Sequence, residues 1–125
     1  MLPRALLDDV SAVKRLGYHV TVVEADSFGN VVFSEYAITP GYSKTSSTVL
    51  IRAPLSYRNG GPDMFWTDVD LVLEGGGVPA SADVIETYLG RQWRRFSWHP
   101  QNWSPAVDDL RTYLEFIDNR LAKHR

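Results

Sequence analysis

Apolar side chains recur at helical spacing near the start of the chain. Leu6, Val10 and Val13 are three or four residues apart, which places them on one face of a helix. Gly17 then supplies a typical stop signal, because glycine readily adopts the backbone that ends a helix. The pattern therefore predicts an opening helix over residues 2–16.

A second helical pattern lies at the end of the chain. Ser104 is a good N-cap residue, and Pro105 fits the first position of a helix. The apolar positions that follow share one face and are Val107, Leu110, Leu114, Ile117 and Leu121. Basic residues suit the negative end of such a helix, and here they are Arg120, Lys123, His124 and Arg125. We expect a long amphipathic C-terminal helix.

The residues between these two helices read mainly as β-strands. Two β-rich runs within residues 18–38 flank a turn of Asp, Ser, Gly and Asn, which is typical of an antiparallel hairpin. Residues 48–53 (TVLIRA) and 64–67 (MFWT) give a third and a fourth strand. A glycine-rich loop follows, and residues 80–90 favour one or two helical turns. The order predicts an α+β fold, with an N-terminal and a C-terminal helix packed on one face of a four-stranded antiparallel meander.

Composition narrows the class of protein. The 125 residues fit a single domain, residues 1–125, and a hydrophobic fraction of 44% allows a core without cross-links. A net charge of −2 argues against nucleic-acid and anionic-membrane partners. No stretch approaches the roughly 18 apolar residues of a membrane span, and acidic residues interrupt the first ten positions, where a secretion signal is apolar. We expect a cytoplasmic protein with no membrane partner.

The chain contains no cysteine, which excludes disulfides, thiolate zinc sites and a thiol nucleophile. A run of carboxylates consists of Asp63, Asp68, Asp70 and Glu74. Their spacing does not follow an EF-hand loop, and no histidine joins them in sequence. We therefore expect a solvent-facing strand edge here, with no metal and no cofactor.

The segment RRFSWHPQNWSP, residues 94–105, gathers most of the candidate chemistry. Ser97 and His99 are two residues apart, so in an extended segment both project to the same side, where the imidazole could take the hydroxyl proton. The alternative is a structural role, with Ser97 in a turn and His99 bonded to the backbone. Thr87 and Tyr88 are further hydroxyl candidates.

Arginine and tryptophan surround the two candidate catalytic residues. Arg94 and Arg95 could bind the carboxylate-ending tail of a partner through bidentate hydrogen bonds. Trp93 and Trp98 suit a docking surface beside them, since tryptophan and arginine are enriched at binding hot spots. The alternatives are a solvated arginine face and tryptophans that pack in the core, which is the role we expect for Trp103.

The order of elements and several short motifs resemble the ubiquitin-conjugating enzyme family. Pro54, Tyr57 and Pro62 match the family's proline and aromatic turn after the third strand, and Trp-Ser-Pro at residues 103–105 matches its tryptophan-x-proline step. Together with PDMFW and GRQWRRFSWH, these motifs are similar to a bacterial branch of ubiquitin-conjugating-like proteins. The resemblance covers residues 18–121 and implies a ubiquitin-conjugating-enzyme-like (UBC) fold.

Two features of that family are missing. Its His-Pro-Asn motif should follow the fourth strand, where residues 69–75 read VDLVLEG instead. Its catalytic cysteine should precede the tryptophan-x-proline step, and the chain has none. The resemblance then implies that a hydroxyl carries the acyl group, and Ser97 with His99 as its base is the best-placed pair.

Members of that branch are typically encoded near ubiquitin-like proteins and a ThiF-type activating enzyme. The resemblance therefore implies that the chain accepts a ubiquitin-like protein from such an enzyme and transfers it, through an oxyester. An alternative keeps the fold without the catalysis, as a scaffold that binds a ubiquitin-like protein or the activating enzyme. A third class is a small hydrolase that uses a serine, His99 and an aspartate such as Asp108 or Asp109, although the chain has no Gly-x-Ser-x-Gly elbow.

Overall fold

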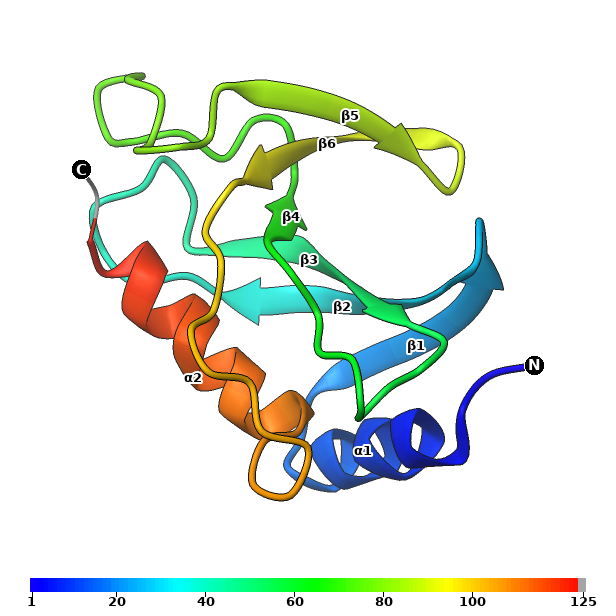
Figure 1. Cartoon of the computed structure of the whole chain (residues 1–125). Helices are drawn as coiled ribbons and strands as arrows, with labels where there is room; N and C mark the ends of the chain where they lie inside the picture. The colour runs from blue at the N-terminus through cyan, green and yellow to red at the C-terminus, as the bar shows by residue number, and fades with distance from the viewer. Residues whose placement is uncertain (124–125) are drawn as a thin grey trace.

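The computed structural model describes residues 1–123, and Figure 1 shows two helices beside one curved sheet in this part of the chain. In chain order the elements are α1 (Arg4–Arg15), β1 (His19–Ala25), β2 (Phe28–Ala37), β3 (Ser46–Pro54), β4 (Phe65–Thr67), β5 (Val84–Tyr88), β6 (Arg91–Phe96) and α2 (Leu110–Leu121). The basic residues His124 and Arg125, expected at the helix end, lie outside the described residues.

The opening helix confirms its apolar pattern. Leu6, Val10 and Val13 are buried along α1, on the side that faces the rest of the molecule. Pro3 has extended backbone just before the first helical residue. Gly17 follows the helix with a φ of 103°, a left-handed conformation that glycine adopts without strain and that turns the chain into β1.

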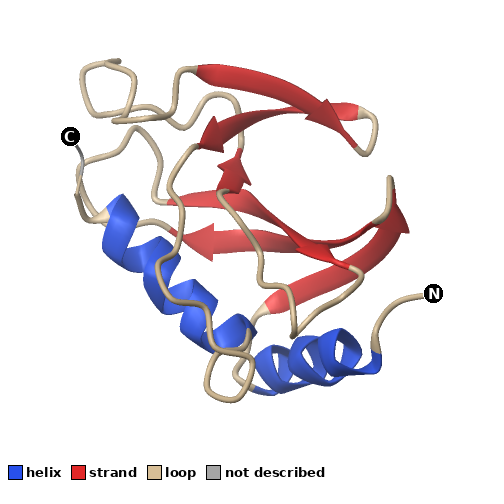
Figure 2. Ribbon diagram, in the orientation of Figure 1, coloured by secondary structure: helices blue, strands red, loops and turns tan. Residues whose placement is uncertain are grey.

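The sheet has six antiparallel strands in the order β1-β2-β3-β4-β6-β5. The four-stranded meander predicted from the sequence is therefore wrong in its number of strands, because the sheet has six. Strands β1 to β4 do neighbour one another in chain order, but β4 is only three residues long, and the β5–β6 hairpin extends the sheet beyond it. Figure 2 shows both helices on one side of this sheet.

The β5–β6 hairpin replaces the helical turns predicted for residues 80–90, and that prediction is wrong. The segment carries the β-favouring residues Val84, Ile85 and Thr87, and β6 offers it a complete row of backbone partners. The connecting turn consists of Leu89 and Gly90, both with positive φ (54° and 75°), as a type I′ hairpin turn requires. Residues 84–88 therefore form a strand because they pair with β6, which comes later in the chain.

The C-terminal helix is shorter than predicted, because it begins at Leu110 and not beside Pro105. Asp109 has extended backbone and is the N-cap, and its carboxylate accepts a hydrogen bond from the N–H of Thr112 while the Thr112 hydroxyl accepts one from the N–H of Asp109. The backbone carbonyl of Ser104 instead accepts hydrogen bonds from the N–H groups of Val107 and Asp108, in a separate turn. Val107, predicted on the apolar face of the helix, is exposed. The reciprocal cap fixes the start of α2.

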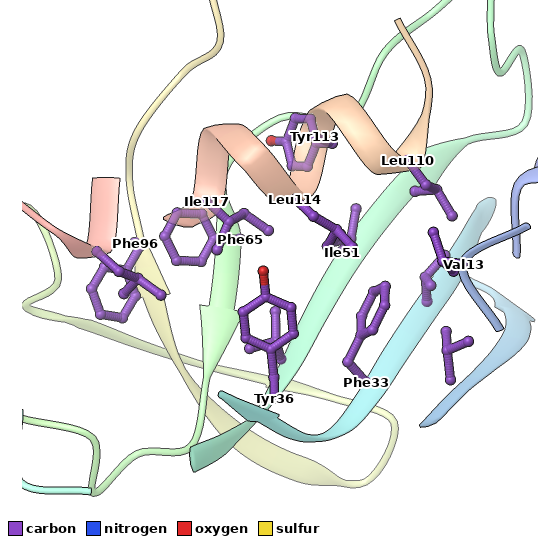
Figure 3. Packing of buried hydrophobic residues seen from close by; sticks show 14 of the residues in the cluster. Val13, Phe33, Tyr36, Ile51, Phe65, Phe96, Leu110, Tyr113, Leu114 and Ile117 are labelled. Atoms are coloured by element: carbon purple, nitrogen blue, oxygen red, sulfur yellow. The ribbon is translucent and has the colours of Figure 1, made fainter. Parts of the chain in front are cut away.

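The main core fills the space between the sheet and the two helices. Figure 3 shows side chains of α2 pointing toward those of the sheet, with Tyr113, Leu114 and Ile117 above Phe33 and Ile51. Phe65 of β4 and Phe96 of β6 are stacked at 4.9 Å between ring centroids, which continues the same core to the far strands. The apolar face of α2 predicted from the sequence is thus buried from Leu110 onward.

A second apolar cluster consists of Leu50, Trp66 and Trp93, which are all buried. Partly buried Val32, Met64 and Tyr88 pack against these three residues. Leu50 on β3 lies directly opposite Trp66 on β4, whereas the neighbours of Leu50 in the chain, Val49 and Ile51, belong to the main core. This cluster therefore occupies the opposite face of the sheet.

Neither described helix has the length and the apolar composition that a membrane span needs.

Candidate functional site

The connection between β6 and α2 crosses the connection between β3 and β4, and the candidate catalytic residues lie at this crossing. The indole N–H of Trp103 donates to the carbonyl of Arg58 at 2.8 Å, and the hydroxyl of Tyr113 donates to the carbonyl of Met64 at 2.7 Å. Burial, together with the nearby negative charge of Asp63, raises the pKa of Tyr113 well above its usual range, so this phenol stays a donor. Two backbone segments are thereby held against each other by side-chain donors.

Trp103 is half-buried and packs against the main core, in keeping with the packing role expected for it. Its ring lies directly over Gly61, where a Cβ atom would collide with the indole. Tyr57 and Tyr113 flank the indole at 5.8 and 6.4 Å between ring centroids. The close approach of the two loops therefore depends on a glycine in one and a tryptophan in the other.

The first of these loops is anchored to α1 by a buried carboxylate. Asp9 accepts hydrogen bonds from both the Nε and the Nη2 of Arg58, at 3.1 and 2.6 Å, and from the hydroxyl of Tyr57. Burial and the hydrogen bond to Asp9 raise the pKa of Tyr57 well above its usual range. The helix thus fixes the loop that carries Asp63.

The imidazole of His99 and the carboxylate of Asp63 are in direct contact. The Nδ1 of His99 lies 2.6 Å from Oδ1 of Asp63, and the two side chains are 61% and 55% exposed. A carboxylate at Nδ1 fixes the orientation of the imidazole and leaves Nε2, on the opposite side of the ring, available to take a proton. The imidazole is thus held by a carboxylate on one side and is exposed to solvent.

Ser97 lies just after β6 but is not joined to His99. Its hydroxyl accepts a hydrogen bond from Nε of Arg95 at 2.9 Å, and its backbone N–H donates to the carbonyl of Ser81. Within residues 1–123 no hydrogen bond connects Ser97 and His99. The structure therefore places the two residues in the same loop and gives each its own partner.

Two hollows lie near the His99–Asp63 pair, one at Pro100, which follows His99, and one at Asp63. One, of about 130 Å³, lies between Pro100 and Gln101 of the loop and Tyr113 and Phe116 of α2. The other, of about 220 Å³, has Asp63 at its edge and opens on the sheet face that carries the second apolar cluster. The pair is therefore exposed next to two concave surfaces.

The sequence profile described as prokaryotic E2 family E matches residues 6–124. The chain belongs to this family. No curated protein and no solved structure matches the chain. The predicted resemblance to bacterial ubiquitin-conjugating-like proteins is confirmed. Membership of an E2-like family indicates a role in ubiquitin-like conjugation and, with it, interaction with ubiquitin-like proteins and activating enzymes.

In this member of prokaryotic E2 family E, two of the four residues predicted to bind a partner are directed inward. Trp93 is 1% exposed, and its indole N–H donates to the carbonyl of Tyr88. Arg94 is buried and donates to the carbonyls of Val69 and Ala82, at 3.1 and 2.6 Å. The Trp93 bond joins β6 to β5 within the hairpin, whereas the Arg94 bonds hold β6 to the neighbouring loops.

The other two predicted binding residues of the family E chain are partly accessible. Arg95 is 26% exposed and donates to Glu86 at 3.0 Å as well as to Ser97. Trp98 is half-buried, with the guanidinium of Arg120 lying 4.6 Å from the centre of its ring. Of the four, these two retain surface for a partner.

Most of the remaining candidates in the E2-like chain have structural partners. Asp108 accepts a hydrogen bond from the N–H of Ser104, Asp109 caps α2, and the hydroxyl of Tyr88 donates to Glu86. Thr87 is exposed on β5. Asp68 and Asp70 both accept from Lys44, and within the described residues no three His, Cys, Asp or Glu side chains gather as metal ligands do.

Sequence reasoning missed the partnership of Asp63 with His99. In the sequence, Asp63 is recognisable only as one member of a run of carboxylates, and 36 residues separate it from His99. No local pattern links two positions so far apart. The one usable signal was that PDMFW and the tryptophan-rich loop both belong to the motifs of the same family.

Proposed function

We propose that this E2-like chain accepts a ubiquitin-like protein from a ThiF-type activating enzyme and transfers it to an amine at the crossing of the two loops. The observation that carries the proposal is the 2.6 Å contact between Asp63 and an exposed His99. An oriented imidazole is the group that an acyl transfer without a cysteine needs, because a hydroxyl is a poor nucleophile until a base takes its proton.

In the proposed reaction, the hydroxyl oxygen of Ser97 attacks the carbonyl carbon of the thioester that links the ubiquitin-like protein to its activating enzyme. Nε2 of His99 takes the hydroxyl proton, the C–S bond breaks, and the departing thiolate receives that proton. An oxyester on Ser97 results. An amine then attacks the same carbonyl carbon, and the Ser97 oxygen leaves as a hydroxyl.

The proposed attack requires Ser97 to change its hydrogen-bond partner. Its hydroxyl now accepts from Arg95, so a rotation about the Cα–Cβ bond has to bring Oγ toward His99. Arg95 also pairs with Glu86, which keeps the guanidinium in place when the serine leaves. Trp98 and Arg95, which retain exposed surface, are the proposed contacts for the incoming partner.

The test is an adduct assay with the cognate activating enzyme, ATP and the cognate ubiquitin-like protein. We expect an adduct that survives thiol, is cleaved by mild hydroxide, is absent in Ser97→Ala and is strongly reduced in His99→Ala. Ser104→Ala is the matched control, because it removes a hydroxyl from the same loop, and that hydroxyl makes no hydrogen bond within residues 1–123. This variant should behave as the wild type. An adduct of full yield in Ser97→Ala contradicts the assignment of this serine.

A non-catalytic scaffold is the second candidate, and the separate partners of Ser97 and His99 favour it. In that case the ubiquitin-like protein binds without forming an adduct under any condition. Titration calorimetry then gives equal affinities for the wild type and Ser97→Ala, whereas Trp98→Ala weakens binding. Loss of the adduct together with unchanged binding would distinguish a catalytic serine from a scaffold contact.

A further inference from the structure

The larger hollow lies on the sheet face that carries the second apolar cluster, opposite the helices. Its volume is about 220 Å³, and it lies between the start of β2, the end of β3, β4 and the end of β5. Phe28 and Tyr88 line it from β2 and β5, and Met64 and Trp66 give it an apolar wall. Sites for drug-sized ligands occupy roughly 300–1,000 Å³, so this hollow suits a ligand of about amino-acid size.

Arg52 is the group in this pocket that has hydrogen-bond donors to spare. Its side chain is 10% exposed, and its guanidinium carbon lies 4.2 Å from the ring centre of Phe28 and 3.9 Å from that of Tyr88. The two rings hold the guanidinium between them. Its Nε donates to Oδ1 of Asn30 at 3.0 Å, which fixes the plane of the group further.

The two Nη groups of Arg52 are left without a hydrogen-bond partner in the described part of the chain. The nearest carboxylate, on Asp26, is 4.0 Å from Nη2, which is an ion pair but is beyond hydrogen-bond distance. An arginine side chain that is nine-tenths buried and keeps unused N–H groups is unusual, because buried donors are nearly always paired. The two Nη groups of Arg52 can therefore donate hydrogen bonds to an acceptor that enters the pocket.

The acidic residues at the pocket are already engaged. Glu86 accepts hydrogen bonds from the Trp66 indole at 2.9 Å, from the Tyr88 hydroxyl at 3.2 Å and from Arg95 at 3.0 Å. Asp63, at the edge, is paired with His99. Glu86 is therefore ion-paired with Arg95 and Asp63 is bonded to His99, and an anionic ligand at the Arg52 Nη groups meets a guanidinium and two aromatic faces.

We infer that this pocket binds a carboxylate of about amino-acid size, with the carboxylate held by the Nη groups of Arg52 and the apolar part packed against Trp66 and Met64. A planar guanidinium matches a carboxylate through two parallel hydrogen bonds, which lysine cannot reproduce. The inference does not rest on the transfer reaction, because neither Ser97 nor His99 lines the pocket. A free small carboxylate and the C-terminal carboxylate of a chain share this chemistry.

The test is titration calorimetry of the full chain with the matched pair N-acetyl-leucine and N-acetyl-leucine amide, which differ in the carboxylate alone. We expect the acid to bind at least about tenfold more tightly than the amide, since a charge-assisted hydrogen-bond pair is worth that ratio or more. Arg52→Lys should weaken binding of the acid by a similar factor. Arg91→Lys is the control, because Arg91 lies outside the pocket and should leave the affinity unchanged.

A nine-residue peptide that ends in leucine with a free carboxylate distinguishes the two possible ligands, a free small carboxylate and the C-terminal carboxylate of a chain. Tighter binding of the peptide than of N-acetyl-leucine identifies a chain end, and binding of N-acetyl-leucine alone identifies a free small molecule. The inference is overturned if neither probe binds at roughly 10 mM, or if acid and amide bind within a factor of about two. It is also overturned if a folded Arg52→Lys binds the acid as the wild type does, and the acid–amide comparison decides the matter if that variant does not fold.

Discussion

At the scale of single residues, Asp68 shows how charge is distributed around the far strands. Its carboxylate accepts hydrogen bonds from Lys44 and Arg91, both at 2.8 Å, and from the backbone N–H of Thr48 at 3.1 Å. Burial raises the pKa of Asp68, but these hydrogen bonds outweigh it and leave the pKa well below its usual range. The residue thus joins the start of β3 to the end of β4 and the start of β6.

This depressed pKa makes a prediction about stability and pH. Asp68→Asn should lower the free energy of unfolding by about 1–3 kcal/mol at neutral pH, because three donors lose a charged acceptor. The contribution is fully present above the unfolded-state pKa of roughly 3.9 and is lost as the pH falls below that value toward the folded-state pKa. Urea denaturation of both proteins at about pH 7 and pH 3 should show a difference that shrinks at the lower pH.

The control for this experiment is Asp70→Asn. The Asp70 side chain is 76% exposed, and among the described side chains it pairs only with Lys44, so its replacement should change stability by less than about 0.5 kcal/mol. An Asp68→Asn deficit that stays constant across the pH range would contradict the ion-pair account.

Gly61 gives a second prediction at the scale of single residues. A Cβ atom at this position would collide with the Trp103 indole, so Gly61→Ala should cost about 1–3 kcal/mol of unfolding free energy by displacing that ring. In Gly77→Ala the new Cβ would meet Leu73 at an ordinary 3.8 Å, which makes it the matched control. Thermal unfolding of the two variants measures the difference, and equal midpoints would show that the loops can separate freely.

At the scale of secondary-structure elements, the start of α2 depends on a reciprocal cap. Asp109 and Thr112 each bond the other's backbone N–H, at 3.0 Å in both directions. The preceding turn at Ser104 is independent of that cap, although the sequence alone makes Ser104 the better-looking start. The cap therefore determines where the connection that carries His99 ends.

Replacement of the cap tests which residue starts the helix. Asp109→Ala should lower the free energy of unfolding by about 0.5–2 kcal/mol, the usual effect of losing an N-cap. Ser104→Ala should have an effect of less than about 0.5 kcal/mol, because its side chain caps no helix. Chemical denaturation measures both, and a larger loss for Ser104→Ala would mean that the helix starts earlier in solution.

At the scale of the whole molecule, the candidate site depends on elements from both ends of the chain. Asp9 on α1 fixes the loop that carries Asp63. Trp103 fastens the loop that carries His99 to the same segment, and Tyr113 fastens helix α2 to it. The exposed His99–Asp63 pair therefore rests on a buried support that includes the N-terminal helix. Loss of that support should affect stability and activity together.

Asp9→Asn tests this dependence. The Asp9 side chain is 8% exposed, and its replacement leaves Arg58 and Tyr57 with a neutral partner, so we expect a loss of about 3 kcal/mol in unfolding free energy. The adduct yield should fall as well, because Asp63 loses its fixed position. Asp8→Asn is the control: that side chain is 64% exposed and should show neither effect. A stable Asp9→Asn protein with full adduct yield would contradict the proposed support.

Sequence reasoning succeeded where one segment's own pattern decides its structure. Leu6, Val10 and Val13 lie on the buried face of α1 as predicted, and the apolar face of α2 is buried from Leu110 onward. It failed for β5, because a strand exists only when another strand accepts its hydrogen bonds, and β6 does so here. It also failed for the start of α2, where Asp109 and Thr112 together outcompete Ser104.

The sequence by itself determined the α+β class, the family and the absence of a cysteine nucleophile, because these follow from periodicity, short motifs and residue identity. The tertiary structure alone decided that His99 meets Asp63, that Arg94 is turned inward, and that Arg52 is held between Phe28 and Tyr88. Each of these contacts joins positions that are distant in the chain, so it depends on strand order and loop crossing, which no local pattern encodes.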